Sequence, residues 1–147
     1  MRLLVSAGPT REMIDAVRYL SNLSSGRLGY AVAEAASARD HDVHLVSGPV
    51  PLSPPRGIRV THVVSAAEMC AAIAEAWSDA DALVMTAAVA DYRPARRIDG
   101  KLKKSKGPLI LELARNPDIL NTLAPSKGDK VVVGFVFEVQ NAESEVR

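Results

Sequence analysis

Short β-rich apolar runs alternate along this chain with stretches of helical periodicity. Alternation of this kind is typical of βαβ units, in which a crossover helix joins two parallel strands. It predicts an α/β fold, a Rossmann-like three-layer sandwich with a mostly parallel sheet. The predicted strands span 2–7, 42–47, 59–64, 81–87, 108–113 and 130–137, and the predicted helices span 25–39, 66–78 and 117–123.

The size and composition of the chain fit one globular domain. Its 147 residues are 48% hydrophobic, enough to bury a core of their own. The longest apolar stretches, 83–90 and 131–137, fall far short of the roughly 18 residues that a membrane span needs. The apolar run near Met1 stops at Gly8-Pro9, which is too soon for a signal peptide. We therefore expect a single domain over 1–147 with no membrane partner.

Charge and cysteine usage narrow the expected partners. The formal net charge of +1 comes from 18 basic and 17 acidic residues, so the global charge gives no reason to expect a nucleic acid. The segment 93–106, however, carries seven basic residues against one acid, Asp99, and is predicted to attract anions. The single cysteine, Cys70, cannot form an internal disulfide, which fits a cytoplasmic location.

A candidate phosphate loop lies between the first predicted strand and the first predicted helix. The strand ends at the chain-breaking pair Gly8-Pro9, and a hydroxyl-rich stretch then leads into the helix. The first N–H groups of a helix have no partners within it and attract anions, and glycines there let a ligand or the sheet approach closely. The phosphate-loop candidates are Gly8, Ser24, Ser25 and Gly26.

Local signals refine this outline. Ligands of open α/β sheets bind beyond the carboxyl ends of the strands, so the loops 8–25, 86–93 and 116–118 are expected to meet there. Ser65 and Glu68 have the spacing of a capping box at the start of the second helix, and Asn116 and Pro117 fit the N-cap and first turn of the third. The buried face predicted for the first helix consists of Leu28, Ala31, Val32 and Ala35.

An NAD(P)-dependent oxidoreductase is one alternative that the α/β pattern leaves open. The segment 24–29 loosely resembles the Gly-x-Gly-x-x-Gly fingerprint, but Ser24 replaces the first glycine and the segment does not follow the first strand directly. The acidic residue that binds a ribose hydroxyl is also missing, because the second strand closes with Val46-Ser47-Gly48. No Walker motif is present either.

Several longer segments match known motifs in order along the chain. They are 6–12 (SAGPTRE), 17–26 (VRYLSNLSSG), 87–92 (AAVADY), 101–104 (KLKK), 116–119 (NPDI) and 133–135 (VGF). Together they resemble phosphopantothenoylcysteine synthetase, a ligase that is often the C-terminal half of the bifunctional coenzyme A biosynthesis flavoprotein. The similarity extends from residue 3 to about residue 140.

The resemblance implies a two-step ligation. The carboxylate of 4′-phosphopantothenate would attack the α-phosphate of CTP to give an acyl-cytidylate and pyrophosphate, and cysteine would then displace CMP. CTP is thus the expected nucleotide substrate, with Mg²⁺ offsetting the charge of its triphosphate. ATP in place of CTP is left open, because spacing alone does not determine base choice. The expected partners are the two substrates and either a second copy or a complementing chain.

The resemblance also assigns roles to individual residues. Asn22 matches an asparagine that contacts the acyl-nucleotide intermediate, a task that suits an amide because it can donate and accept without ionising. The nucleotide-binding residues implied by the family motifs are Thr86, Ala87, Ala88, Asp91, Lys101, Asn116, Pro117, Asp118, Ile119 and Phe135. The metal ligands stay unknown, because His41, His44 and His62 have no recognisable ligand spacing.

The chain departs from the family pattern near its end. The stretch 135–139 reads FVFEV where the family usually has Phe-Ala-Ala/Leu-Glu-Thr, and the family continues with a lysine-bearing segment that is not in this sequence. We therefore expect a single nucleotide-binding ligase domain over 1–147 that lacks the C-terminal segment of the family. A non-catalytic CTP-binding subunit or fragment that needs a second chain is the main alternative.

Overall fold

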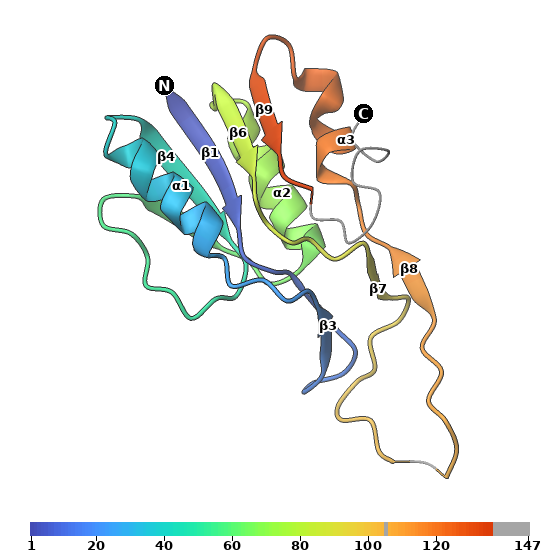
Figure 1. The fold of residues 1–147 in the computed structure, drawn as a ribbon. Coiled ribbons are helices and arrows are strands. Elements are labelled where there is room, and N and C mark those ends of the chain that lie inside the picture. The colour runs from blue at the N-terminus through green and yellow to red at the C-terminus, as the bar shows by residue number, and fades with distance from the viewer. Residues whose placement is uncertain (105, 137–147) are drawn as a thin grey trace.

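The computed structural model describes residues 1–104 and 106–136, and within them five strands form one parallel sheet (Figure 1). In spatial order these are β5 (Arg59–His62), β4 (Asp42–Ser47), β1 (Arg2–Ala7), β6 (Ala82–Met85) and β9 (Val131–Gly134). Every pairing between neighbours in this sheet is parallel. The predicted α/β class is therefore confirmed.

Helices cover both faces of the sheet, which gives the three predicted layers (Figure 1). One face, with Val5 and Leu45, packs against α1 (Arg27–Ser37). The other face, with Leu4, Val46 and Leu83, packs against α2 (Ala66–Trp77) and α3 (Ile119–Leu123), which a 3₁₀ turn, η1 (Ala124–Ser126), follows. Successive residues of each central strand thus serve opposite cores. The longest helix among the described residues has 12 residues, too few to cross a membrane.

Two short antiparallel ribbons lie beyond the carboxyl ends of the sheet strands. One pairs β2 (Arg11–Met13) with β3 (Tyr19–Ser21), and the other pairs β7 (Tyr92–Pro94) with β8 (Leu113–Arg115). The segment between β7 and β8, described over 95–104 and 106–112, projects from the body of the molecule and is called the arm below (Figure 1). The sequence predicted neither ribbon, because strands of three residues carry no measurable periodicity.

The predicted strand at 108–113 is wrong. Residues 108–112 are not in a strand, and β8 begins only at Leu113 and pairs with β7 outside the main sheet. The apolar run there is exposed, with Ile110 at 88%, so its hydrophobicity does not reflect a core position. The strands predicted at 59–64 and 81–87 end two residues early. The last predicted strand, 130–137, forms only over Val131–Gly134, and its position 137 lies outside the described residues.

Of the residues predicted for the buried face of the first helix, only Val32 packs against the core. Leu28 is half exposed and Ala31 and Ala35 are exposed, whereas the buried residues of α1 are Gly29, Tyr30, Ala33 and Ala36. Because α1 is rich in alanine, it is apolar on several sides. The periodicity of its sequence therefore does not show which side is buried. Tyr30 decides the orientation, because its hydroxyl forms a 3.1 Å hydrogen bond with the buried Ser47 Oγ.

The capping predictions had mixed outcomes. Ser65 caps α2, its Oγ accepting from the N–H of Glu68 at 3.2 Å. The N-cap of α3, however, is Asp118 rather than Asn116, and its Oδ1 accepts from the N–H of Asn121 at 2.9 Å. Asn116 is unsuited to capping because its side chain is committed elsewhere, donating to the carbonyl of Ala90 at 2.8 Å.

Candidate active site

A cleft of about 680 Å³ opens at the carboxyl ends of β6 and β9. Its floor includes Met85 and Gly134, the last residues of these two strands. Its walls are the connection that follows β6 and the stretch from the end of β8 into α3. This is the edge of the sheet at which open α/β folds bind ligands.

Seven of the predicted nucleotide-binding residues line this cleft, although they come from three segments far apart in sequence. They are Ala87, Asp91, Asn116, Pro117, Asp118, Ile119 and Phe135. Thr86, Ala88, Lys101 and Asn22 are not part of the lining, and neither are the four phosphate-loop candidates. The structure therefore brings most of the predicted nucleotide residues together and leaves the others around the rim or farther away.

Two of the lining side chains already have partners within the chain. Asn116 donates to the carbonyl of Ala90 and accepts from Arg93 Nη1 at 3.1 Å, so it braces β8 against the connection after β6. Asp118 uses its carboxylate on the backbone and the side chain of Asn121. By contrast, Asp91 is exposed at the cleft, and it is the lining carboxylate best placed to meet a ligand.

Asn22 lies outside the cleft lining but bonds to the segment that forms one wall. Its Nδ2 donates to the carbonyls of Ala88 at 3.3 Å and Val89 at 3.2 Å, and Val89 lines the cleft. The exposed amide is therefore held against the segment that forms the wall, with its oxygen directed away from these two carbonyls. The Thr86 side chain points away from the cleft, because its hydroxyl donates to the carbonyl of Ser6 at 2.6 Å.

The phosphate-loop candidates meet at the start of α1. Gly8 and Gly26 both have positive φ angles, 77° and 72°, and a Cβ on Gly26 would lie 3.3 Å from the Cα of Gly8. A side chain on Gly26 would therefore force its neighbours to shift, above all Val50, whose Cγ1 would lie 2.7 Å from the added Cβ. Ser24 Oγ accepts from the N–H of Gly26 at 3.3 Å and Ser25 Oγ from that of Arg27 at 3.4 Å, so the serines occupy N–H groups that an anion would take over.

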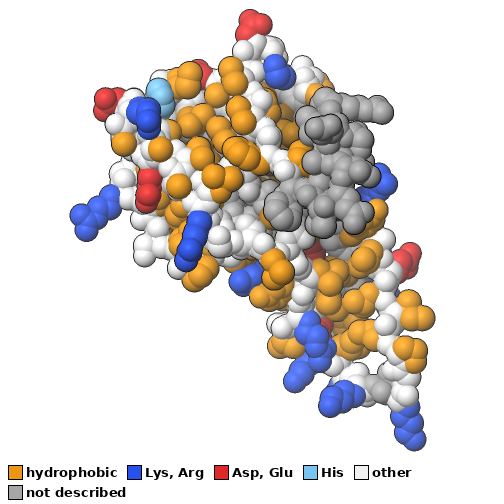
Figure 2. All heavy atoms as spheres, in the orientation of Figure 1, with side chains coloured by type: hydrophobic (Ala, Val, Ile, Leu, Met, Phe, Trp, Pro, Cys, Tyr) orange, Lys and Arg blue, Asp and Glu red, His pale blue; other side chains and the backbone are white. Residues whose placement is uncertain are grey.

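Lys101 lies in the arm rather than at the cleft. The arm runs beside the turn between β2 and β3, where the N–H of Ala16 donates to the carbonyl of Gly100 at 2.9 Å. The N–H of Ile98 likewise donates to the carbonyl of Ile14 at 2.9 Å. Figure 2 shows lysine and arginine side chains gathered at the outer end of the arm, as the charge of segment 93–106 leads one to expect.

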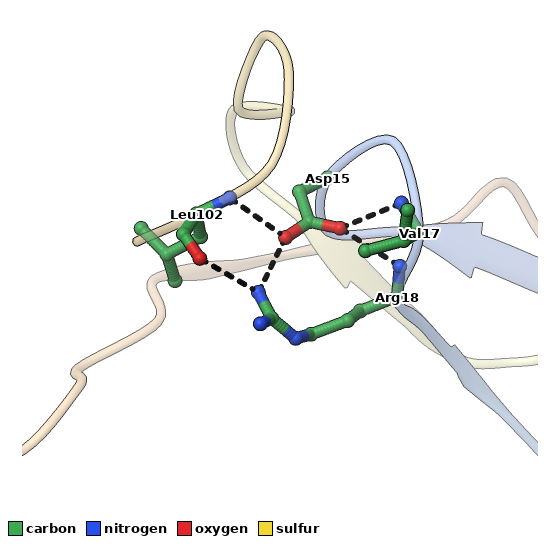
Figure 3. Close-up of polar contacts among 4 residues, drawn as sticks. All are labelled: Asp15, Val17, Arg18 and Leu102. Carbon is green, nitrogen blue, oxygen red and sulfur yellow. Dashed lines mark hydrogen bonds and ion pairs between the residues drawn. The ribbon is translucent and has the colours of Figure 1, made fainter. Parts of the chain in front are cut away.

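Asp15 anchors the arm to this turn and is fully buried (Figure 3). It accepts from the N–H groups of Val17, Arg18 and Leu102 and from Arg18 Nη1. The N–H of Val17, opposed by burial and supported by Leu102 and Arg18, holds the pKa of the Asp15 carboxyl below its ordinary value. Sequence reasoning missed this residue, although an aspartate two residues before its N–H donor is a signal for an Asx turn.

Sequence reasoning also missed half of the cleft lining. These residues are Met85, Val89, Ala90, Tyr92, Arg115, Leu120, Gly134 and Val136. Arg115 alone is basic among the described lining residues, and it is paired with Tyr92 across the ribbon of β7 and β8. Each is a direct neighbour of a predicted residue, so the boundaries of the motifs were the available signal. No group of three or more metal-ligating side chains is found within 1–104 and 106–136.

Comparison with known proteins places this chain in a family. The family model described as the DNA/pantothenate metabolism flavoprotein C-terminal domain matches residues 1–147. The chain belongs to this family. The resemblance drawn from the sequence motifs is thereby confirmed.

The relatives are bacterial proteins of coenzyme A biosynthesis. The chain is 44% identical over 146 residues to the coenzyme A biosynthesis bifunctional protein CoaBC of Bacillus subtilis, covering 99% of this chain and 36% of that protein. It is 43% identical over 153 residues to CoaBC of Mycobacterium tuberculosis, covering 99% and 37%. The chain therefore spans about a third of the length of these curated relatives.

Solved structures agree with the fold. A crystal structure of the C-terminal domain of CoaBC is 42% identical, with a TM-score of 0.84, and the match covers 97% of this chain and 67% of that one. A structure of a Cab2 mutant in complex with phosphopantothenate-cysteine has a TM-score of 0.82 at 16% identity, covering 96% of this chain and 65% of that one. At that identity the likeness concerns the fold alone.

Proposed function

We propose that this chain is a phosphopantothenate–cysteine ligase domain of coenzyme A biosynthesis that uses CTP to activate its acid substrate. The observation that carries the proposal is the convergence of Ala87, 89–91, 116–119 and Phe135 on one cleft at the carboxyl ends of β6 and β9. A solved C-terminal domain of CoaBC is 42% identical to this chain over the region that matches, and it has the same fold there. We also take the cytoplasm as the location of the activity.

The reaction has two balanced steps. A carboxylate oxygen of 4′-phosphopantothenate attacks the α-phosphorus of CTP, the bond to the β-phosphate oxygen breaks, and pyrophosphate leaves. The amine of cysteine then attacks the acyl carbon, an amide bond forms, and CMP leaves with the electrons of the acyl–oxygen bond. The amine proton goes to solvent. Activation is needed because a free carboxylate is a poor acyl donor.

The cleft suits a nucleotide. Ala87 and Ala90 keep side chains short where the connection after β6 forms one wall, so backbone groups can approach a base edge. Phe135 and Tyr92 supply exposed aromatic faces on the lining. Pro117 and Ile119 belong to the opposite wall. Ile119, the first residue of α3, fixes the backbone there because its side chain is buried in the core. Discrimination of CTP from ATP would therefore rest on the backbone around 86–88.

Asn22 is our candidate for contact with the acyl-cytidylate. Its Nδ2 is held by the carbonyls of Ala88 and Val89, so its orientation is set before a ligand arrives. Such preorganised polar groups lower the barrier when charge develops in the transition state. The neighbouring start of α1, with Ser24, Ser25, Gly26 and Gly8, would receive a phosphate group of a substrate.

Mg²⁺ would enter with the triphosphate. This ion is usually held by one or two carboxylates together with substrate phosphates, and the exposed carboxylate of Asp91 at the cleft fits that requirement. When bound, Mg²⁺ neutralises phosphate charge. Lys101, on the arm, is the candidate cation from the protein.

Pyrophosphate release by the purified chain tests the function. We expect release that requires 4′-phosphopantothenate and CTP, reaches multiple turnovers only when cysteine is added, and is weaker with ATP. Release that is independent of 4′-phosphopantothenate would contradict the ligase assignment.

A nucleotide-binding piece that needs a complementing chain is the second candidate. It is favoured by the coverage of the solved CoaBC domain, of which this chain matches 67%. Its signature is CTP binding without pyrophosphate release, followed by release once the remaining part of such a domain, or a second copy, is supplied. An oxidoreductase has no such support, since β4 ends at the buried Ser47 and not at an acidic residue.

A further inference from the structure

One fully buried carboxylate has no place in the chemistry proposed above. Asp15 lies in the turn between β2 and β3, outside the cleft lining, and yet it is 0% exposed. Burying a carboxylate is unfavourable unless hydrogen bonds compensate for lost hydration. Asp15 receives four such bonds, and their distribution between its two oxygens indicates its role.

The two oxygens of Asp15 serve different partners (Figure 3). Oδ1 accepts from the N–H groups of Val17 and Arg18, both at 2.8 Å, and so shapes the turn itself. Oδ2 accepts from Arg18 Nη1 at 2.5 Å and from the N–H of Leu102 at 3.0 Å. Arg18 Nη1 also donates to the carbonyl of Leu102 at 3.2 Å, so both backbone groups of Leu102 are held. We call this set of contacts the Asp15 clamp.

The clamp connects the basic arm to the wall of the cleft. Leu102 is flanked by the exposed Lys101 and Lys103. On the other side, the ribbon of β2 and β3 continues into Thr10, whose buried hydroxyl accepts from the N–H of Ala90 at 2.9 Å. Ala90 lines the cleft. Lysine side chains are long and flexible, so the place from which they extend determines which anion they can reach.

We propose that Asp15 is a positioning residue that fixes Leu102, and with it the origin of Lys101 and Lys103, relative to the cleft. The proposal rests on the proposed function, because it takes the β- and γ-phosphates of CTP as the anion that these lysines meet. The β2–β3 ribbon and its turn would then hold the two lysines within reach of the triphosphate, although neither contacts the nucleotide.

The substitution Asp15→Asn separates positioning from folding. An asparagine has one acceptor oxygen, which can keep the N–H groups of Val17 and Arg18 and so preserve the turn. Its NH₂ group then faces the N–H of Leu102 and the Arg18 guanidinium, which are also donors. Only the half of the clamp that holds the arm is lost. Glu12→Gln is the matched control, because Glu12 is a 3% exposed carboxylate on β2 that accepts from the N–H of Ala66.

Calorimetric titration of the chain with CTP and with CMP measures the effect. We expect Asp15→Asn to weaken CTP binding about tenfold, the size of one lost charge-assisted contact, and to leave CMP binding unchanged. Glu12→Gln should change neither affinity. Hydrogen exchange should be faster at Leu102 in Asp15→Asn but not at Val17 or in β1.

The outcomes that contradict the positioning role and the proposed function can be told apart. If the unsubstituted chain binds CTP and Asp15→Asn binds it equally well, the positioning role is wrong and the proposed function stands. Equal weakening of CTP and CMP by Asp15→Asn also overturns positioning, since it indicates general damage to the site. If the unsubstituted chain binds neither nucleotide, the proposed function fails and the role of the lysines fails with it.

Discussion

At the scale of single residues, the polar side chains around the cleft divide into those that brace the backbone and those left to meet a ligand. Asn116 and Asp118 line the cleft but already bond to Ala90, Arg93 or Asn121. Their substitution would alter the shape of the site before it altered its chemistry. Asn22 is different, because within 1–104 and 106–136 only the NH₂ group of its side chain has a partner, and the residue is exposed.

Substitution of Asn22 by alanine should therefore separate turnover from stability. We expect pyrophosphate release to fall about 10²-fold, as for the loss of one preorganised polar contact, while the melting temperature changes little because the side chain is exposed. Glu34→Ala, which removes an exposed side chain of α1 outside the cleft lining, should stay close to the rate of the unsubstituted chain. Equal rates for Asn22→Ala and Glu34→Ala would rule out the assigned role.

At the scale of elements, α1 packs tightly against the sheet at Gly29. Gly29 lies where α1 crosses the ends of β1 and β6, and a Cβ there would come within 2.5 Å of Ala7 Cβ and of Thr86 Oγ1. It would also lie 2.9 Å from the backbone oxygen of Ser6. Backbone cannot rotate away as a side chain can, so the helix itself would have to shift.

Gly29→Ala should consequently destabilise the protein by about 1–3 kcal/mol, the usual range for overpacking. Gly107→Ala is the control, because an added Cβ there meets nothing within 4 Å. Urea unfolding followed by circular dichroism measures both. A midpoint for Gly29→Ala that matches the unsubstituted chain would mean that α1 is free to move outward.

The elements also show which structural features the sequence could predict. Leu4-Val5 and Leu83 belong to strands buried on both faces, and their unbroken apolar character was a sufficient signal. Ser65 marked the start of α2 because capping is local. The face of α1 was not predictable from an alanine-rich pattern, since it depends on the contact between Tyr30 and Ser47. That contact joins residues far apart in sequence.

At the scale of the whole molecule, two titratable side chains, His44 and Asp15, make the free energy of unfolding depend on pH. Burial, with help from the charge of Arg59, lowers the pKa of His44 below its ordinary value. The pKa of Asp15 is lowered chiefly by the N–H of Val17. In both cases the unfolded chain takes up its proton at a higher pH than the folded one does. Stability is therefore lost as pH falls, in two separate windows.

We expect the melting temperature to fall first below a pH of about 6.5, the ordinary value for histidine, and again below about 4 as Asp15 becomes protonated. His44→Gln should flatten the upper window, and Asp15→Asn should flatten the lower one. Thermal denaturation between pH 3 and pH 8 checks both. A melting temperature for His44→Gln that falls as steeply as that of the unsubstituted chain between pH 7 and pH 5 would exclude the histidine contribution.

The cleft lining was predictable only where several of its residues are consecutive in sequence. The segments 87–91 and 116–119 could be found because several of their residues line one wall each. The place of Lys101, by contrast, depends on a bond between Asp15 and Leu102, 87 positions apart. Such a contact is invisible to local patterns, because a polar residue in a turn is expected to face water.

The central position of β1 has a consequence for the kinetics of folding. β1 is the first strand of the chain, yet it lies between β4 and β6 and pairs with residues 42–47 on one side and 82–85 on the other. During synthesis, β1, α1 and β4 can assemble early. The other edge of β1 stays unpaired until β6 has been synthesised and has left the ribosome. Pairings of such long sequence separation fold slowly. Substitutions that weaken β6 should accordingly retard the rate of folding and not only hasten unfolding.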